Sequence, residues 1–242
     1  MAISVVLLSW RRPENLQQIV GALRKNPLVK EVIIWNNNPE ITLKSDEAII
    51  INSAHNFLCL ARYCLVPLTK HPLIWFQDDD LLISAEQLDA IVSAYSMAPD
   101  RIYGCRGRNL IQGRYAPVIV YGECDIILGQ SMLFHKKLFY EVAATFYALD
   151  SIERADDIAF SLLCRRKHFA VNVEPLVDLG EHDEHALWRQ PGHFSVRQQI
   201  VDRLLAAPQR PPLERPASAT KKENGRETQP GNPAERQQAG PR

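Results

Sequence analysis

Short, continuously apolar segments alternate with amphipathic ones along the first part of the chain. Residues 3–8 read Ile-Ser-Val-Val-Leu-Leu, and similar runs occupy residues 32–35, 48–51 and 73–76. Such runs are typical of strands that are covered on both faces of a parallel sheet. Apolar residues at helical spacing follow Pro13, and a further helix is expected around residues 58–68. The alternation predicts an α/β fold, with a mostly parallel central sheet and helices on both faces.

The rest of the folded part is expected to be richer in strands. Ser84 and Gln87 have the spacing of a capping box, so a helix is predicted to begin there. Gln112-Gly113 predicts the turn of a hairpin. Further elements are expected as strands at 124–134 and 170–176 and as helices at 138–145, 157–166 and 196–205.

The composition changes abruptly near residue 208. Residues 208–242 contain repeated prolines and many polar residues, and Leu213 is their only large aliphatic residue. Such a segment cannot bury enough apolar area to offset its ordering entropy. We therefore predict one domain at 1–207 and a disordered tail at 208–242.

Charge and cysteine content limit the class of protein and its location. Lys plus Arg and Asp plus Glu both number 28, so the formal net charge of +0 provides no field that would attract nucleic acid. The 5 cysteines form no CxxC pair, which indicates reduced thiols and a cytoplasmic protein. No segment approaches the roughly 20 apolar residues of a membrane span. The tail mixes both charges, which favours a solvated tail over peripheral association with the inner face of a membrane.

Polar residues follow several of the predicted strands at the point where each strand ends. Arg12, Asn36 and the triplet Asp78-Asp79-Asp80 occupy such positions. Ligands of open α/β sheets bind beyond the carboxyl ends of the strands. Three adjacent carboxylates repel one another unless a cation is present, and Mg²⁺ or Mn²⁺ is held by carboxylates together with phosphate oxygens. The triplet therefore predicts a metal and nucleotide site of the DXD type. The alternative is a polar turn before a capped helix.

Six motifs occur in a characteristic order. They are Leu8-Ser-Trp-Arg-Arg12, Val32-Ile-Ile-Trp-Asn-Asn37, Asp78-Asp79-Asp80, Pro99-Asp-Arg-Ile102 with Gly104, Ala155-Asp-Asp-Ile-Ala159, and His193-Phe-x-x-Arg197. In this order they resemble the exostosin-like transferases, glycosyltransferase family 64, from Val5 to about Leu205. The resemblance implies a GT-A fold and a role in polysaccharide biosynthesis.

The resemblance also implies a reaction and a site. The donor would be a UDP-N-acetylhexosamine (GlcNAc or GalNAc), the cofactor Mn²⁺ or Mg²⁺, the acceptor a glycan or polysaccharide, and the anomeric configuration would be retained. Four residues would hold uracil, ribose and diphosphate: Arg12, Asn36, Asn56 and Arg62. Asp78 and Asp79 would contact nucleotide and sugar, while Asp80 would bind the metal. The catalytic pair would be Asp157, near the reacting carbon, and Arg197, on the diphosphate.

Two mechanisms and two other functions stay open at this stage. Asp157 is either the nucleophile of a double displacement or the electrostatic stabiliser of a same-face displacement, and the second is favoured. From local sequence alone, Asp156-Asp157 also suits the first turn of a helix. The alternative functions are a catalytically inactive sugar-nucleotide-binding protein, favoured by Leu8 and by a slightly longer segment from Asn56 to Arg62, and a metal-dependent phosphohydrolase.

Two further features concern the metal and the acceptor. Residues 181–185, Glu-His-Asp-Glu-His, form a polar loop in which His182 or His185 is a candidate metal ligand, although a surface loop is favoured. Trp188 is a candidate for stacking on an acceptor sugar, whereas Trp10, Trp35 and Trp75 are expected to pack at strand ends.

Overall fold

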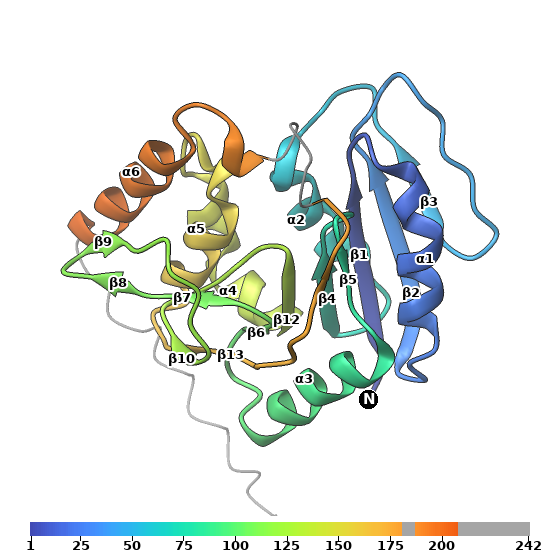
Figure 1. Ribbon diagram of the computed structural model, residues 1–242. Helices are drawn as coiled ribbons and strands as arrows, with labels where there is room; N and C mark the ends of the chain where they lie inside the picture. Colours follow the sequence, from blue (N-terminus) through green and yellow to red (C-terminus); the bar gives the residue numbers. More distant parts are fainter. Residues whose placement is uncertain (181–186, 208–242) are drawn as a thin grey trace, which may run out of the picture. The chain divides into compact units, whose positions relative to one another are not determined.

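Figure 1 shows the protein as a computed structural model, which describes residues 1–180 and 187–207. Its centre is a sheet of 8 strands. In spatial order these are β10 (Gly122–Cys124), β13 (His168–Ala170), β6 (Tyr103–Gly104), β12 (Ser131–His135), β4 (Leu73–Gln77), β1 (Ile3–Ser9), β2 (Val29–Asn36) and β3 (Ile49–Asn52). Strands β3, β2, β1 and β4 run parallel, whereas β12 is antiparallel to both of its neighbours.

Six α-helices and three small two-stranded sheets complete the described part of the chain. The helices are α1 (Pro13–Arg24), α2 (Ala61–Leu65), α3 (Ala85–Met97), α4 (Lys136–Tyr147), α5 (Asp156–Leu163) and α6 (His193–Ala206). The small sheets pair β11 (Ile126–Ile127) with β7 (Gly107–Arg108), β14 (Val177–Asp178) with β5 (Leu81–Leu82), and β8 (Leu110–Ile111) with β9 (Arg114–Tyr115). Short 3₁₀ turns lie at Leu58–Leu60, Val66–Leu68, Ile152–Arg154 and Leu187–Arg189.

Helices cover both faces of the sheet, as predicted. Every residue of β1 is buried, and successive side chains enter different clusters. Val5 and Leu7 pack in the cluster that includes residues of α1 and α3. Val6 packs in the cluster that includes residues of α2, α4, α5 and α6. Because side chains alternate across a strand, a continuously apolar run serves two cores at once. Figure 1 shows α1 and α3 on one side of the sheet and α2 and α4 on the other.

An aromatic cluster fixes α2 and α5 over the sheet. The Tyr63 ring, on α2, has its centroid 4.5 Å from that of Phe146 and 5.1 Å from that of Phe76. Phe160, on α5, packs 4.9 Å from Phe134 of β12. Aromatic pairs at such distances contribute about 0.5–1.5 kcal/mol beyond the burial of their area. Rigid packing here matters because α2 and α5 provide charged residues to the site described below.

Two local signals in the sequence, a capping box and a hairpin turn, are confirmed by the structure. Ser84 accepts a hydrogen bond from the backbone of Gln87, and the Gln87 side chain accepts one from the backbone of Ser84, which confirms the capping box. Gln112 and Gly113 have φ values of 50° and 74° in the hairpin between β8 and β9. Such positive φ values are those of a type I′ turn, which matches the twist of the strands.

Several predicted elements differ from the structure. The expected strand at 124–134 is three short strands, because the chain bends at Asp125 and turns at residues 128–130. The expected strand at 170–176 is confined to His168–Ala170, and the next strand is β14, which pairs with β5 outside the central sheet. The run at 48–51 forms the edge strand β3 and is half-exposed instead of buried. The helix expected at 58–68 is one turn of α-helix between two 3₁₀ turns, one of which contains Pro67.

The tail predicted at 208–242 lies outside the described residues. Among the residues that are described, no helix combines the length and the apolar character needed to cross a bilayer.

Candidate functional site

A cavity of about 390 Å³ opens at the carboxyl ends of β1, β2 and β4. Parallel strands end at the same edge of a sheet, which is why Trp10, Asn37 and Asp78 meet there although they are far apart in sequence. The opposite wall is provided by residues of β7, β9, α5 and α6. Of the site residues predicted from sequence, Arg12, Asn56, Arg62, Asp78, Asp79, Asp80, Asp157 and Arg197 line this cavity.

Asp79 holds the chain after β1 in place. One carboxylate oxygen accepts a hydrogen bond from the Trp10 backbone at 2.6 Å, and the other pairs with Arg12 at 2.7 Å. The residue is 4% exposed, and burial raises the pKa of its carboxyl to about 7, against the lowering effect of these two hydrogen bonds. Both oxygens are therefore occupied, and Asp79 orients the Arg12 guanidinium toward the cavity.

Arg62 connects the aspartate triplet to the turn that precedes β12. Its guanidinium pairs with Asp78 at 2.7 Å and donates to the carbonyl oxygen of Gly129. It also lies 3.8 Å from an Asp156 oxygen that has no hydrogen-bond partner. Arg62 is 1% exposed, and its pKa is raised although burial opposes this, because Asp78 and Asp156 favour the charged form. Arg62 therefore stays charged, and its guanidinium is held between Asp78 and Asp156 at the floor of the cavity.

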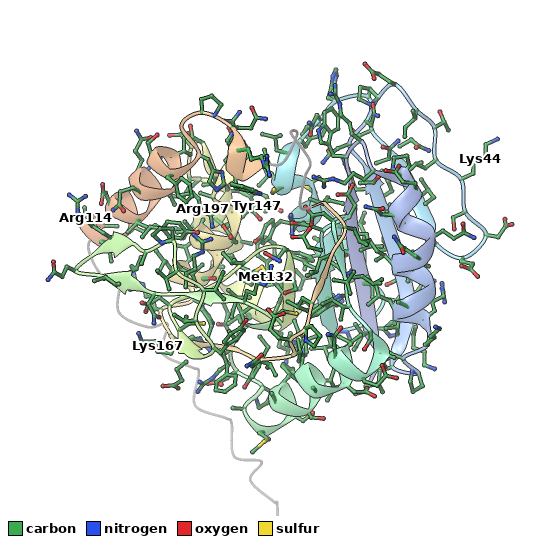
Figure 2. The ribbon with its side chains drawn as sticks, viewed as in Figure 1. Lys44, Arg114, Met132, Tyr147, Lys167 and Arg197 are labelled. Carbon is green, nitrogen blue, oxygen red and sulfur yellow. The ribbon has the colours of Figure 1, made fainter. Side chains whose placement is uncertain are left out.

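A second buried ion pair lies beside the first. Arg197 of α6 contacts Asp157 of α5 at 2.7 Å, and the same Asp157 oxygen accepts a hydrogen bond from the Gly129 backbone at 3.2 Å. Figure 2 shows Arg197 between these two helices. Burial would raise the pKa of Asp157, but the charge of Arg197 and the hydrogen bonds outweigh it, so the pKa is lowered. Asp157 is thus a carboxylate that stays ionised.

The asparagine that lines the cavity at the end of β2 is Asn37 and not the predicted Asn36. Asn36 does not line the cavity: it is fully buried, and its side-chain amide donates to Ile41 and Asn52. It remains within β2, paired with Asn52 in the sheet. Asn37, the next residue, lies beyond the strand and lines the cavity, where it accepts hydrogen bonds from Trp35 and from the Phe57 backbone. Adjacent asparagines at the end of a strand could not be told apart from sequence.

Asp80 is the most exposed carboxylate of the triplet and its best candidate for holding a cation. Its side chain is 31% exposed and lies 3.3 Å from Arg12. Its pKa is raised to about 6, first by burial and then by the charges of Asp78 and of Asp178, which also lines the cavity. Within residues 1–180 and 187–207, no three ligand side chains are arranged to hold a metal alone. The exposed carboxylate of Asp80 would fit a Mg²⁺ or Mn²⁺ ion that takes most of its ligands from phosphate and water.

Two other predicted features have different outcomes. Residues 181–185, the candidate second metal cluster, lie outside the described residues. Trp188 is 58% exposed and lines the cavity, and the Arg189 guanidinium carbon lies over its ring, 4.7 Å from the centroid. Stacking of Trp188 on an acceptor sugar stays a prediction. Of the tryptophans expected to pack, Trp75 is fully buried, whereas Trp10 is part of the cavity lining.

Gly129 is one residue of the site that the sequence did not predict. Its backbone accepts from Arg62 and donates to Asp157, so it joins the two ion pairs. A Cβ atom there would lie 3.4 Å from the Arg62 guanidinium and 3.4 Å from Asp157. The signal was a glycine that interrupts the apolar run at 124–134, which was interpreted as one strand.

The profile of the Glycosyl transferase family 64 domain matches residues 3–222. The chain belongs to this family. Among curated proteins, this family-64 chain is similar to mouse Exostosin-like 2, with 23% identity over 237 residues that cover 84% of the chain and 72% of the relative. The resemblance stated from the six motifs is confirmed.

Solved structures of similar fold include two of S. aureus TarS 1–349. The first has a TM-score of 0.58 at 12% identity and covers 87% of the chain and 67% of TarS. The second, a complex with UDP, has a TM-score of 0.52 at 12% identity and covers 74% and 59%. The 2-C-methyl-D-erythritol 4-phosphate cytidylyltransferase of Thermus thermophilus has a TM-score of 0.50 at 16% identity, with 72% and 90% covered. At these identities the likeness concerns the fold, and it confirms the predicted GT-A architecture.

Proposed function

We propose that this protein transfers GlcNAc or GalNAc from a UDP-sugar to a glycan acceptor, with retention of configuration and with Mn²⁺ or Mg²⁺ as cofactor. The observation that carries the proposal is the pair of buried ion pairs joined by Gly129 at the cavity floor. They hold two guanidinium groups beside the aspartate triplet. Fixed positive charge beside a cation site is what a leaving diphosphate requires.

The proposed donor lies along the ends of β1, β2 and β4. Arg12 and Asn56 line this part of the cavity, and Asn37 replaces Asn36 as the residue of the Trp-Asn-Asn motif that faces it. The UDP bound by TarS, which shares the fold, supports a uridine nucleotide as ligand. Asp80 would hold the metal, which when bound neutralises charge on the diphosphate. Asp79 would act through Arg12, and its contact with the donor stays a prediction.

Asp157 suits the stabilising role better than the nucleophilic one. Its carboxylate is 4% exposed and is held by Arg197 and the backbone of Gly129. A carboxylate with such partners keeps its negative charge and is a poor nucleophile, because attack would remove charge from a favourable pair. This supports same-face displacement, in which the leaving phosphate helps to deprotonate the acceptor hydroxyl.

Calorimetric titration tests the proposal. UDP is expected to bind in the presence of Mn²⁺, at least about tenfold more weakly with EDTA, and Asp80→Asn is expected to lose this metal dependence. Asp150→Asn is the matched control, because Asp150 is 88% exposed in its side chain and does not line the cavity. UDP affinity indifferent to both EDTA and Asp80→Asn would refute the proposal.

Hydrolysis of UDP-sugars separates the proposed function from its alternatives. Incubation with UDP-GlcNAc, UDP-GalNAc, UDP-Glc and UDP-Gal in Mn²⁺ is expected to release UDP from the N-acetylhexosamine donors first. UDP binding without release of UDP, with or without acceptors, indicates the inactive binding protein. Release of phosphate from simple phosphomonoesters indicates the phosphohydrolase. A cytoplasmic location remains a prediction.

A further inference from the structure

Leu58 has a backbone conformation that is unusual for a leucine. Its φ is 50°, in the left-handed region, which bulky residues rarely adopt because the Cβ atom comes too close to the following carbonyl oxygen. The residue begins the 3₁₀ turn that precedes α2, and α2 lies beside β1 (Figure 1). Leu58 is partly buried and lines the cavity. Residues held in such conformations are concentrated at functional sites, so this one calls for an explanation.

Hydrogen bonds fix the Leu58 backbone on both sides. Its N–H donates to the side-chain oxygen of Asn56 at 2.8 Å, and its carbonyl oxygen accepts a hydrogen bond from the side-chain amide of Asn37 at 3.0 Å. The Asn37 oxygen accepts another from the backbone of Phe57, also at 3.0 Å. These bonds offset the cost of the left-handed conformation and favour it over the alternatives.

Asn37 has little hydrogen-bonding capacity left for a ligand. An amide side chain can accept two hydrogen bonds and donate two. The Asn37 oxygen accepts from the Trp35 indole at 3.1 Å and from Phe57, and one of its N–H groups donates to Leu58, so three of these four bonds are made within the protein. The main effect of the Asn37 side chain is therefore to position Phe57 and Leu58.

Apolar side chains distinguish this part of the cavity from its charged floor. Leu8, near the end of β1, lines the cavity together with Leu58, and it pairs in the sheet with Trp35 of β2. An apolar side chain forms no hydrogen bond with a diphosphate or with the hydroxyl groups of a sugar. A nucleobase, in contrast, has two faces that favour apolar contact. Of the parts of a UDP-sugar, the base is therefore the one that Leu58 suits.

We propose that Leu58 packs against the uracil base of the donor, and that Asn37 is the residue that positions it there. The inference rests on the proposed function and adds two residues to its donor site. Asn37 acts through the backbone of Leu58, which it holds in the left-handed conformation. A turn that is fixed in this way loses little conformational freedom when the donor binds.

Nuclear Overhauser effects in the full chain, with isotope-labelled leucine methyl groups, test the contact. With UDP and Mg²⁺, the two ring protons of uracil are expected to show such effects to the methyl groups of Leu58, which Leu58→Ala identifies by their disappearance. The variant is also expected to bind UDP about tenfold more weakly, as the loss of two or three carbon atoms from an apolar contact predicts. The weakening should be equal with Mg²⁺ and with EDTA, because Leu58 does not touch the metal end of the donor.

Two further variants control for the substitution and for strain. Leu68→Ala is the same change at a leucine that is 64% exposed and does not line the cavity, and it should leave UDP affinity unchanged. Leu58→Gly also lacks the side chain, but glycine adopts the left-handed conformation freely. It should therefore bind UDP as weakly as Leu58→Ala and melt several degrees higher. Equal melting temperatures would mean that Leu58 is not strained and would overturn the proposal.

A double-mutant cycle separates positioning by Asn37 from direct binding. Asn37→Ala is expected to weaken UDP binding in the otherwise unaltered protein and to have little further effect in combination with Leu58→Ala. Effects that add would mean that Asn37 contacts the donor itself, and would overturn its positioning role. Asn37→Gln, which keeps the amide group but displaces it, gives the same cycle where Asn37→Ala does not fold.

The remaining outcomes separate this inference from the proposed function. If the unaltered protein does not bind UDP, the proposed function fails. If UDP binds, but uracil shows no Overhauser effect to Leu58 and Leu58→Ala binds UDP unchanged, only this inference is overturned. A weakening that occurs with Mg²⁺ but not with EDTA would place Leu58 with the diphosphate, which also overturns it.

Discussion

Two neighbouring carboxyl groups of the site, Asp156 and Asp157, have pKa values that are shifted in opposite directions. The pKa of Asp157 is lowered, whereas burial raises that of Asp156 to about 7, despite the opposing charge of Arg62. The difference follows from partners: Asp157 has a guanidinium contact at 2.7 Å, while an Asp156 oxygen has no hydrogen bond. The unfolded pKa of either group is about 3.9.

Asp156→Asn and Asp157→Asn are therefore expected to change the pH dependence of stability in opposite senses. Asp156 binds its proton more tightly in the folded state, so its carboxylate lowers stability progressively as pH rises from about 4 to about 7. Relative to the unaltered protein, Asp156→Asn should gain at least about 1 kcal/mol in unfolding free energy between these pH values.

Asp157→Asn provides the contrast. Asp157 has a lowered folded pKa, so its stabilisation is fully present above the unfolded pKa and is lost as pH falls through the folded one. The substitution leaves Arg197 without its charged partner and should cost about 3–5 kcal/mol at pH 7, with a smaller deficit below pH about 4. Urea unfolding at several pH values measures both variants. Parallel stability curves for Asp156→Asn and the unaltered protein would contradict the assignment.

At the scale of elements, two glycines differ in how closely other atoms approach them. In β6 a Cβ on Gly104 would lie 2.2 Å from the Ser131 carbonyl oxygen of β12. Gly21 lies on the exposed face of α1, with nothing within 4 Å of a Cβ. Gly104→Ala is therefore expected to destabilise the protein by about 3 kcal/mol or more through backbone displacement. Gly21→Ala should stabilise it by about 0.5–1 kcal/mol. Thermal unfolding of the two variants gives the comparison, and loss of stability in Gly21→Ala would contradict it.

Elements were predictable from sequence where one local signal determined them. The apolar runs predicted β1, β2 and β4 because a strand that is buried on both faces consists mostly of apolar side chains. The run at 124–134 was misread because its turn is stabilised by distant groups: Gly129 is bonded to Arg62 and Asp157, which no local pattern indicates. The strand at 170–176 failed for a similar reason, since the Gln87 side chain binds the carbonyls of Val173 and Pro175 from α3.

Among the residues of the site, Arg12, Arg62 and the triplet were predictable because strand ends converge and because the order of the motifs is specific. Tyr115 was not found, because its hairpin packs against α6, where the Gln198 side chain accepts a hydrogen bond from the Tyr115 backbone at 2.9 Å. Arg108 was not found, because it lies on β7, which pairs with the short strand β11. Tertiary contacts of this kind have no signature in a single sequence.

At the scale of the whole domain, the site depends on both apolar cores. Asp157 and Arg197 come from helices of one core, whereas Arg12 precedes α1, which packs in the other. The central sheet is shared by both cores, because alternate residues of β1 and β12 point to opposite faces. Residues 1–207 should therefore unfold in one cooperative transition.

Binding of UDP and metal should raise the temperature of that single unfolding transition. A ligand that binds only the folded state stabilises it by about 2.7 kcal/mol at 100 times its dissociation constant, whatever core its contacts come from. In differential scanning calorimetry, UDP with Mn²⁺ is expected to move one peak by several degrees, and UDP with EDTA to move it less. Asp80→Asn should lose this difference between Mn²⁺ and EDTA, whereas Asp150→Asn should keep it. Two peaks, of which the ligand moves only one, would mean that the two cores unfold separately and that the cavity is formed by one of them alone.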